Sequence, residues 1–370
     1  VVTGCMAQRY QKEIIQEVPE VDAVLGTTSY GDIVKALEEA VAGNHFEEFR
    51  DIDYLPDTGS KRVLTTGGHF GYLKIAEGCD KHCTYCIIPK LRGKFRSVPM
   101  ERLIAQAEDM AEQGVKELIL VAQETTVYGK DLYGKKSLHI LLKKLCEIKG
   151  IRWIRVLYCY PEEIYDELIE TIRDEKKICH YLDIPIQHAS DRILKRMGRR
   201  TSKQELVDII GKLRKEIPDI VLRTTLITGF PGETEEDHEE LKEFVDEMEF
   251  DRLGVFTYSP EENTPAAEMA DQVPEEVKEE RRDELMELQQ EISYDRGQDR
   301  IGQELLVMIE GKVADESAYI GRTYGDAPKV DGYIFVQTGE LLMTGDFAKV
   351  RVTGALEYDL IGVLSDEYTE

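Results

Sequence analysis

The sequence predicts an α/β fold built around six strand–helix units, with a shorter α/β segment before them and a small all-β barrel after them. Three observations carry this prediction. Between residues 62 and 299, apolar strand-like runs alternate with amphipathic helical runs, as in parallel strands joined by helical crossovers. Six units are fewer than the eight that a closed barrel of parallel strands needs. After residue 300, short alternating runs separated by Gly and Asp replace the helical pattern.

Residues 1–61 have the pattern of the last part of a further α/β domain. The chain starts with strand-like residues and without an initiator Met, so we expect that it begins inside this domain. A polar stretch at 56–61 predicts a linker to the next domain. The expected strands are 1–4 and 23–26, and the expected helices are 10–18 and 33–42.

The central domain, expected at 62–299, should carry its chemistry at the carboxyl ends of its strands, as in other folds of parallel strands. A long charged helix begins at Pro274, and Thr234 with Asp237 forms a capping-box pattern at another helix start. The expected strands are 72–76, 115–122, 153–158, 181–185, 221–228 and 253–258. The expected helices are 99–113, 138–148, 163–173, 203–216, 235–248 and 274–296.

The last domain, expected at 300–370, should be a barrel of about five strands. Four strands stand out at 306–310, 333–337, 348–357 and 360–364. From Ile301 to Glu370 there are 5 Lys and Arg against 13 Asp and Glu, so the net charge of this part is 5 − 13 = −8. An acidic barrel favours a basic partner.

The composition limits where the protein works and what it binds. No apolar run approaches the ~20 residues that span a bilayer, and the N-terminus has no signal-peptide pattern. Seven cysteines without a targeting segment favour a reducing cytoplasm. A net charge of −26 should repel nucleic acid unless a basic patch exists, and should attract basic proteins. The acidic surface could equally serve only to keep the protein in solution.

Three cysteines follow the first strand of the central domain with the spacing Cys-x3-Cys-x2-Cys, at Cys79, Cys83 and Cys86. Three thiolates this close can hold three irons of a 4Fe–4S cluster, which leaves the fourth iron open. The alternative is zinc, but a zinc site needs four ligands and His82 is badly placed as the fourth. A disulfide framework suits a small secreted domain rather than a chain of 370 residues.

This spacing resembles the signature of the radical S-adenosylmethionine (SAM) superfamily. In that superfamily the open iron binds the amino and carboxylate groups of SAM, and an electron from the cluster breaks an S–C bond to give a 5′-deoxyadenosyl radical. The resemblance implies a 4Fe–4S cluster, SAM and an external electron donor, and it implies that the six strand–helix units form the open, partial barrel of that superfamily. It also places Tyr85, the aromatic residue before the last cysteine, near the SAM adenine.

Residues after other strands are candidates for holding SAM. Gln123 and Glu124 follow the second strand of the central domain, and Gln187 follows the fourth. Arg223 lies in the fifth strand, where it either binds the SAM carboxylate or forms a structural salt bridge, because a buried arginine needs a partner. Phe230 lies between Gly229 and Gly232 in a segment that can turn close to a ligand.

Over essentially its whole length, the chain resembles the methylthiotransferases, which are radical SAM enzymes of three domains. The matching segments are residues 3–10, the cysteine loop with its continuation at 88–97, and 229–234, and the last domain resembles a TRAM barrel. The family carries a second 4Fe–4S cluster on three cysteines of its N-terminal domain. Cys5 matches the last of these, and the other two would lie upstream.

Residues 158–161 and 322–332 are similar to the family branch that modifies a ribosomal protein. That branch adds a methylthio group to the β-carbon of one aspartate in the twelfth small-subunit ribosomal protein, so this similarity implies the same activity. A basic ribosomal protein is then the expected partner, and nucleic acid is not expected as the direct substrate. Asp326 and Asp331 are expected either as docking acids or only as caps of turns.

Two alternatives stay open. One is a tRNA adenosine methylthiotransferase, which a basic, aromatic barrel surface would favour. The other is a non-catalytic protein-binding module with a structural metal, which would bind iron or zinc without cleaving SAM.

Overall fold

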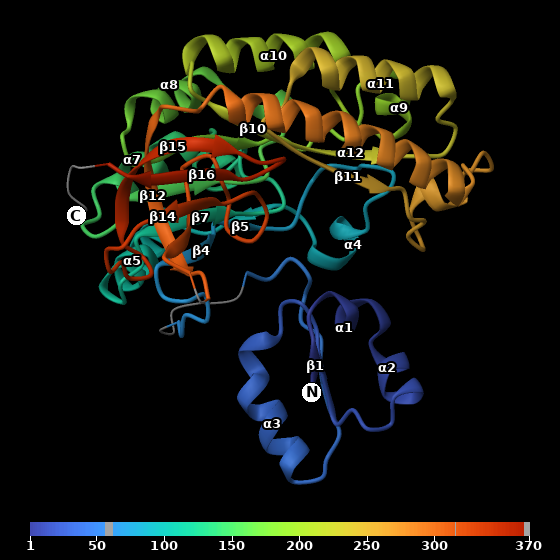
Figure 1. Cartoon of the computed structure of the whole chain (residues 1–370). Coiled ribbons are helices and arrows are strands. Elements are labelled where there is room, and N and C mark those ends of the chain that lie inside the picture. The colour runs from blue at the N-terminus through green and yellow to red at the C-terminus, as the bar shows by residue number, and fades with distance from the viewer. Residues whose placement is uncertain (56–61, 315, 366–370) are drawn as a thin grey trace.

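The computed structural model describes residues 1–55, 62–314 and 316–365 of the chain. Three parts follow one another along it (Figure 1): a small α/β unit, a large α/β core and a β-barrel. The expected linker at 56–61 lies outside the described residues. No helix in the described ranges is both long and apolar enough to cross a lipid bilayer.

The first unit is a parallel three-stranded sheet in the order β1-β2-β3. A helix was expected at 10–18, and α2 lies there; α1, which precedes it, was not predicted, and Gln11, with a left-handed backbone of φ 41°, separates the two. The strands are β1 (Val2–Thr3), β2 (Ala23–Leu25) and β3 (Phe46–Glu48), and the helices are α1 (Cys5–Tyr10), α2 (Lys12–Glu17), η1 (Tyr30–Asp32) and α3 (Ile33–Val41).

The core contains an open sheet of six parallel strands in the order β11-β10-β9-β8-β7-β4, which confirms the predicted partial barrel. Consecutive strands are neighbours in this order, as expected for repeated strand–helix units. The strands are β4 (Phe70–Lys74), β7 (Glu117–Val121), β8 (Trp153–Val156), β9 (Ile178–Asp183), β10 (Val221–Thr228) and β11 (Arg252–Thr257). A short antiparallel pair, β5 (Ala76–Glu77) with β6 (Arg96–Ser97), stands beside the sheet.

The core helices bury their apolar faces on this sheet in one continuous hydrophobic cluster. Where a capping box is present, the predicted helix bounds are matched: Ser202 with Glu205 starts α10, and Thr234 with Asp237 starts α11. The helices are α4 (Ile88–Arg92), α5 (Met100–Glu112), α6 (Lys130–Tyr133), α7 (Leu138–Cys146), η2 (Pro161–Glu163), α8 (Asp166–Asp174), α9 (Asp191–Arg196), α10 (Lys203–Glu216), α11 (Glu235–Met248), η3 (Pro265–Glu268) and α12 (Glu275–Gln298).

The last part is a closed barrel of five strands in the order β12-β13-β14-β16-β15, as the sequence predicted. The strand without a sequence prediction is β13, which carries Gly321 and ends at the fully buried Arg322. The strands are β12 (Glu304–Lys312), β13 (Ala318–Arg322), β14 (Ile334–Gln337), β15 (Phe347–Ala355) and β16 (Leu360–Leu364).

The barrel packs against the end of the core sheet where the strands begin. Trp153 and Val221, the first residues of β8 and β10, share a buried apolar cluster with Phe347 of the barrel. Glu117, the first residue of β7, is fully buried between two arginines: it accepts from Arg155 Nε at 2.8 Å and from Arg322 Nη2 at 2.7 Å. Arg322 therefore ties the barrel to the core through a carboxylate that both parts share.

Asp326 and Asp331 belong to this interface and not to an exposed docking surface, so the docking role expected for them was wrong. Their alternative role as turn caps is supported, because Asp326 accepts from the Thr323 backbone N–H and Asp331 from that of Ala327. The Asp326 side chain, 3% exposed, accepts from Arg252 Nη2 at 2.6 Å. The Asp331 side chain, also 3% exposed, accepts from the Tyr181 hydroxyl at 2.7 Å and lies 3.3 Å from Arg223 Nε. The barrel surface is accordingly less acidic than the count of −8 suggests, because core arginines neutralise part of that charge.

Candidate functional site

The three cysteines of the Cys-x3-Cys-x2-Cys run lie in the loop between β5 and α4. Gly78 opens the loop with φ +75°, and a side chain there would collide with the Lys94 carbonyl oxygen, so only glycine fits. Cys79 donates its backbone N–H to the Gly93 carbonyl at 3.1 Å, and Cys86 donates to Cys83 at the same distance. The loop is thus fixed by backbone bonds on both sides of the cysteines.

All three cysteines line one cavity of about 430 Å³ at the carboxyl end of the core sheet. Lys74 and Val121, the last residues of β4 and β7, line it as well. The complete lining is Lys74, Cys79, Cys83, Tyr85, Cys86, Ile88, Val121, Ala122, Gln123, Tyr158, Tyr160, Pro185 and Gln187. The cavity therefore lies where a fold of parallel strands places its reactive groups.

The donor set of this cavity fits a cluster better than a single metal ion. Thiols are its only metal-binding side chains among the described residues, because no carboxylate or imidazole is in the lining. Nor do any three His, Cys, Asp or Glu side chains in the described ranges converge on one ion position. In a 4Fe–4S cluster each thiolate binds a different iron, so its ligands stand apart. Burial raises the pKa of Cys79 to about 11.

Three of the residues expected to hold SAM line this cavity. The Oε1 atom of Gln123 is buried and has no hydrogen-bond partner among the described residues, so it is available to a ligand. Gln187 adopts a left-handed backbone with φ 73°, held by bonds to Thr225 and Ile227 of β10. Tyr85 packs edge-on against a buried aromatic ring, 6.3 Å between centroids.

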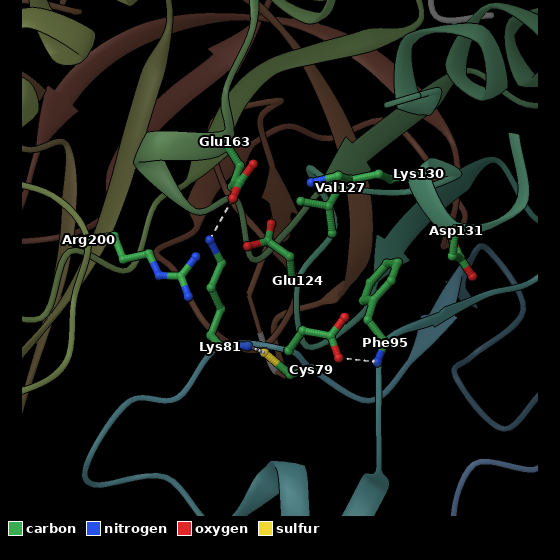
Figure 2. Close-up of a pocket in the computed structure, with 10 residues that line it drawn as sticks. Cys79, Lys81, Phe95, Glu124, Val127, Lys130, Asp131, Glu163 and Arg200 are labelled. Carbon is green, nitrogen blue, oxygen red and sulfur yellow. Dashed lines mark hydrogen bonds and ion pairs between the residues drawn. The ribbon is translucent and has the colours of Figure 1, made fainter. Parts of the chain in front are cut away.

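Glu124 lines instead a second cavity, of about 300 Å³, which shares Cys79 with the first (Figure 2). Its carboxylate is bonded to the backbone N–H and hydroxyl of Thr126, and its second oxygen has no partner within the part of the chain that the structure describes. Burial is the main cause that raises the Glu124 pKa to about 7. Lys81, which also lines this cavity, is paired with Glu163 at 2.7 Å.

Arg223 and Phe230 lie outside the cysteine cavity. Arg223 pairs with Asp183 Oδ1 at 2.7 Å and with Asp331 of the barrel, and it lines a separate space of about 380 Å³ beside the barrel. The structural salt bridge, one of the two roles left open for Arg223, is the one that the geometry supports. Phe230 is fully buried and forms the ring that supports Tyr85 from behind.

Cys5 stands at the start of α1, next to α4 of the core. Arg92, the last residue of α4, donates its Nε–H to the Cys5 sulfur at 3.2 Å, and its Nη1 lies 3.5 Å from Glu77 Oε1. Glu77 is also paired with Lys74 of the cysteine cavity. A chain of charged side chains therefore connects Cys5 with the rim of that cavity.

Sequence reasoning did not single out two tyrosines of the cavity as site residues. Tyr158 is 49% exposed and has φ 60°, a conformation uncommon for a side chain of its size. Tyr160 places its hydroxyl 4.0 Å from the Cys83 sulfur. Both lie within four residues after the end of β8, and this position after a strand was the signal available in the sequence.

Comparisons with known proteins agree with this geometry. A family model described as the radical SAM superfamily matches residues 73–245, and one described as the TRAM domain matches 301–364. A relative from Lachnoclostridium phytofermentans, named ribosomal protein uS12 methylthiotransferase RimO, is 65% identical over 98% of this chain and 82% of its own. The chain belongs to the RimO family.

A second RimO relative, from Clostridium botulinum strain Eklund 17B, is 51% identical over 99% of this chain and 82% of its own. Among solved structures, coproporphyrinogen III oxidase (HemN) from Escherichia coli is similar at a TM-score of 0.48 and 16% identity. That likeness covers 76% of this chain and 66% of HemN, and it adds nothing to the assignment. RimO proteins are radical SAM methylthiotransferases, so membership implies a 4Fe–4S cluster and SAM as cofactors.

Proposed function

We propose that this chain adds a methylthio group to the β-carbon of an aspartate in the ribosomal protein uS12. The observation that carries the proposal is the 65% identity with a RimO protein across 98% of the chain, which includes the barrel as well as the core. The aspartate β-carbon has no proton acidic enough for a side-chain base to remove easily. Radical chemistry, supplied by a cluster-bound SAM, meets that need.

The residues of the cysteine cavity take separate roles in this proposal. Cys79, Cys83 and Cys86 hold the cluster that binds SAM. Gln123 offers its unpartnered Oε1 to the SAM ammonium or ribose, and Gln187 contacts the ribose. Tyr85 lies along the adenine, and Phe230 holds the Tyr85 ring in place without touching the ligand.

Cys5 is proposed as one ligand of a second 4Fe–4S cluster. The support is its position: Arg92 holds its sulfur beside α4, and Glu77 and Lys74 continue from there to the cysteine cavity. A group on Cys5 would then stand close to the place where the substrate carbon reacts. We further propose that the protein works in the cytoplasm and that an external electron donor reduces its cluster. In this proposal, residues 1–61 form the last part of the domain that holds the second cluster, 62–299 form the radical SAM core, and 300–370 form the TRAM barrel.

Anaerobic reconstitution of the full natural protein with iron, sulfide and SAM tests the proposal. Purified uS12 and bulk tRNA are offered in separate reactions, and the products are weighed by mass spectrometry. The expected result is a methylthio adduct on one uS12 aspartate and none on tRNA. Replacing any one of Cys79, Cys83 and Cys86 with Ala should abolish 5′-deoxyadenosine formation. A methylthio adduct on tRNA alone would refute the proposal and support the alternative, a tRNA adenosine methylthiotransferase.

A further inference from the structure

A buried arginine lies directly behind the cysteine loop. Arg199 is 7% exposed and follows α9 in a short turn that supports the loop. Thr84, between the second and third cysteines, donates its backbone N–H to the Met197 carbonyl at 2.9 Å. The Thr84 hydroxyl donates to the Arg196 carbonyl at 2.8 Å. The segment that carries Arg199 is therefore bonded to the loop that carries the cysteines.

The guanidinium of Arg199 has few partners for a buried cation. Its Nη2 donates to the Pro185 carbonyl at 2.8 Å, and the group stacks over the Tyr160 ring at 4.4 Å from the centroid. Its Nε and Nη1 are buried and have no hydrogen-bond partner in the described ranges. No carboxylate of the described residues forms an ion pair with Arg199, and the nearby Glu162 is instead paired with Lys81 at 3.1 Å. A buried charge in this condition is expensive unless an anion is near.

The groups in front of Arg199 identify the missing anion. Tyr160, over whose ring it stacks, and Tyr85 both line the cysteine cavity, and phenols, whose ordinary pKa is about 10, carry no charge near neutral pH. Beyond them lies Cys83, whose sulfur is 4.0 Å from the Tyr160 hydroxyl. Three thiolates on a 4Fe–4S core form an anionic group, which becomes more negative when the core accepts an electron.

We propose that Arg199 is the buried counter-cation of the cluster and that its charge raises the reduction potential of the cluster. The inference rests on the proposed function, because it needs Cys79, Cys83 and Cys86 to hold that cluster. A fixed positive charge in a medium of low dielectric stabilises the reduced, more anionic state more than the oxidised one. Arg199 is a positioning residue that eases electron entry and does not touch the substrate.

Arg199→Gln removes the charge, and Arg200→Gln is the matched control. Arg200 is the next residue in the chain, but it is exposed and lines the second cavity, where water screens its charge. Both variants of the full natural protein are reconstituted anaerobically. Their clusters are titrated against potential without SAM and without substrate, and the reduced state is followed by electron paramagnetic resonance.

At the potential where half of the wild-type clusters are reduced, Arg199→Gln should show about a tenfold lower ratio of reduced to oxidised clusters. That ratio corresponds to about 59 mV for a one-electron couple. Arg200→Gln should match the wild type, and Arg199→Lys, which keeps the charge, should recover most of the potential. An unchanged potential in Arg199→Gln would overturn the inference, even if SAM binding fell, because the residue would then serve SAM.

Urea unfolding separates this role from a purely structural one. The midpoint of Arg199→Gln, relative to wild type, should fall further with the cluster than without it, because only the cluster supplies the anion. An equal fall in both forms, or failure of the cluster-free variant to fold, would make Arg199 a packing residue and contradict the proposal. Failure of the wild type to bind any cluster would instead remove the proposed function itself.

Discussion

Replacing Glu117 with Gln should loosen the barrel from the core. Glu117 is fully buried and accepts one hydrogen bond from Arg155 and one from Arg322. The substitution therefore leaves the buried Arg155 without its carboxylate partner and leaves Arg322 with Glu310 alone, at 2.6 Å from its Nε. Hydrogen bonds to charged groups contribute about 1.5–3 kcal/mol each. Removing one partner of a buried ion pair costs about 3–5 kcal/mol, which is consistent with two such bonds. At a denaturation slope of about 2 kcal/mol per molar urea, the midpoint should fall by roughly 1.5–2.5 M.

The chain offers its own probe for this test. Trp153 is its one tryptophan, and the ring lies 4.8 Å from that of Phe347 across the junction between core and barrel. Tryptophan fluorescence during urea titration therefore reports separation of the two parts. Glu304→Gln, which removes an exposed carboxylate of the barrel from its pair with Arg351, is the control and should leave the midpoint nearly unchanged. Equal shifts for Glu117→Gln and Glu304→Gln would refute the reasoning.

Two further predictions concern acid and the cysteine loop. Burial alone would raise the pKa of Glu117, but Arg155 and Arg322 outweigh it and lower the pKa below its ordinary 4.5; Arg252 lowers that of Asp326 in the same way. The stabilisation that Glu117 and Asp326 contribute is complete above about pH 4.5 and is lost as the pH falls through their lowered pKa values. Trp153 fluorescence should therefore change only in acid. Asp331, whose pKa is raised by burial, has the opposite pH dependence and offsets part of the effect. A transition already complete at neutral pH would contradict the assignment. Gly78→Ala should lower the iron bound after reconstitution several-fold, because a side chain there meets the Lys94 carbonyl, whereas Gly134→Ala, with φ +71° but open space, should bind iron like the wild type. Equal iron content in the two variants would show that the loop tolerates the displacement.

The fold was largely predictable because periodicity and capping are local signals. Strand β10 and helices α10 and α11 have the predicted bounds, and both helices begin at a capping box. Strand β13 was not predicted, because Gly321 weakens its strand pattern and its terminal Arg322 looks like a surface residue. Two carboxylates neutralise the buried Arg322: Glu310 on the neighbouring strand β12, and Glu117, which lies 205 positions earlier in the chain. Such long-range pairing leaves no trace in a local window.

The candidate site was predictable where a residue follows a strand end. Gln123 and Gln187 follow β7 and β9 and line the cysteine cavity; their contacts with SAM stay predictions. Arg223 was predicted in the correct strand. Its position along β10 decides whether its side chain reaches the cysteine cavity or the barrel, and this position depends on the stagger of the neighbouring strands. Asp326 and Asp331 show the same limit: their charge was visible in the sequence, and their burial was not.

The position of the barrel sets the minimum distance that a protein must cover if it contacts both the barrel and the cysteine cavity. The barrel covers the starts of β7, β8 and β10, whereas the cysteine cavity opens where the strands end. A strand of five residues separates the two levels by roughly 15 Å, at about 3.3 Å per residue. A ribosomal protein held by the barrel would have to present its aspartate on an extended segment that follows the flank of the sheet to its other end. The height of the core would therefore allow modification of an aspartate on a long loop, and would prevent modification of an aspartate close to the surface that binds the barrel.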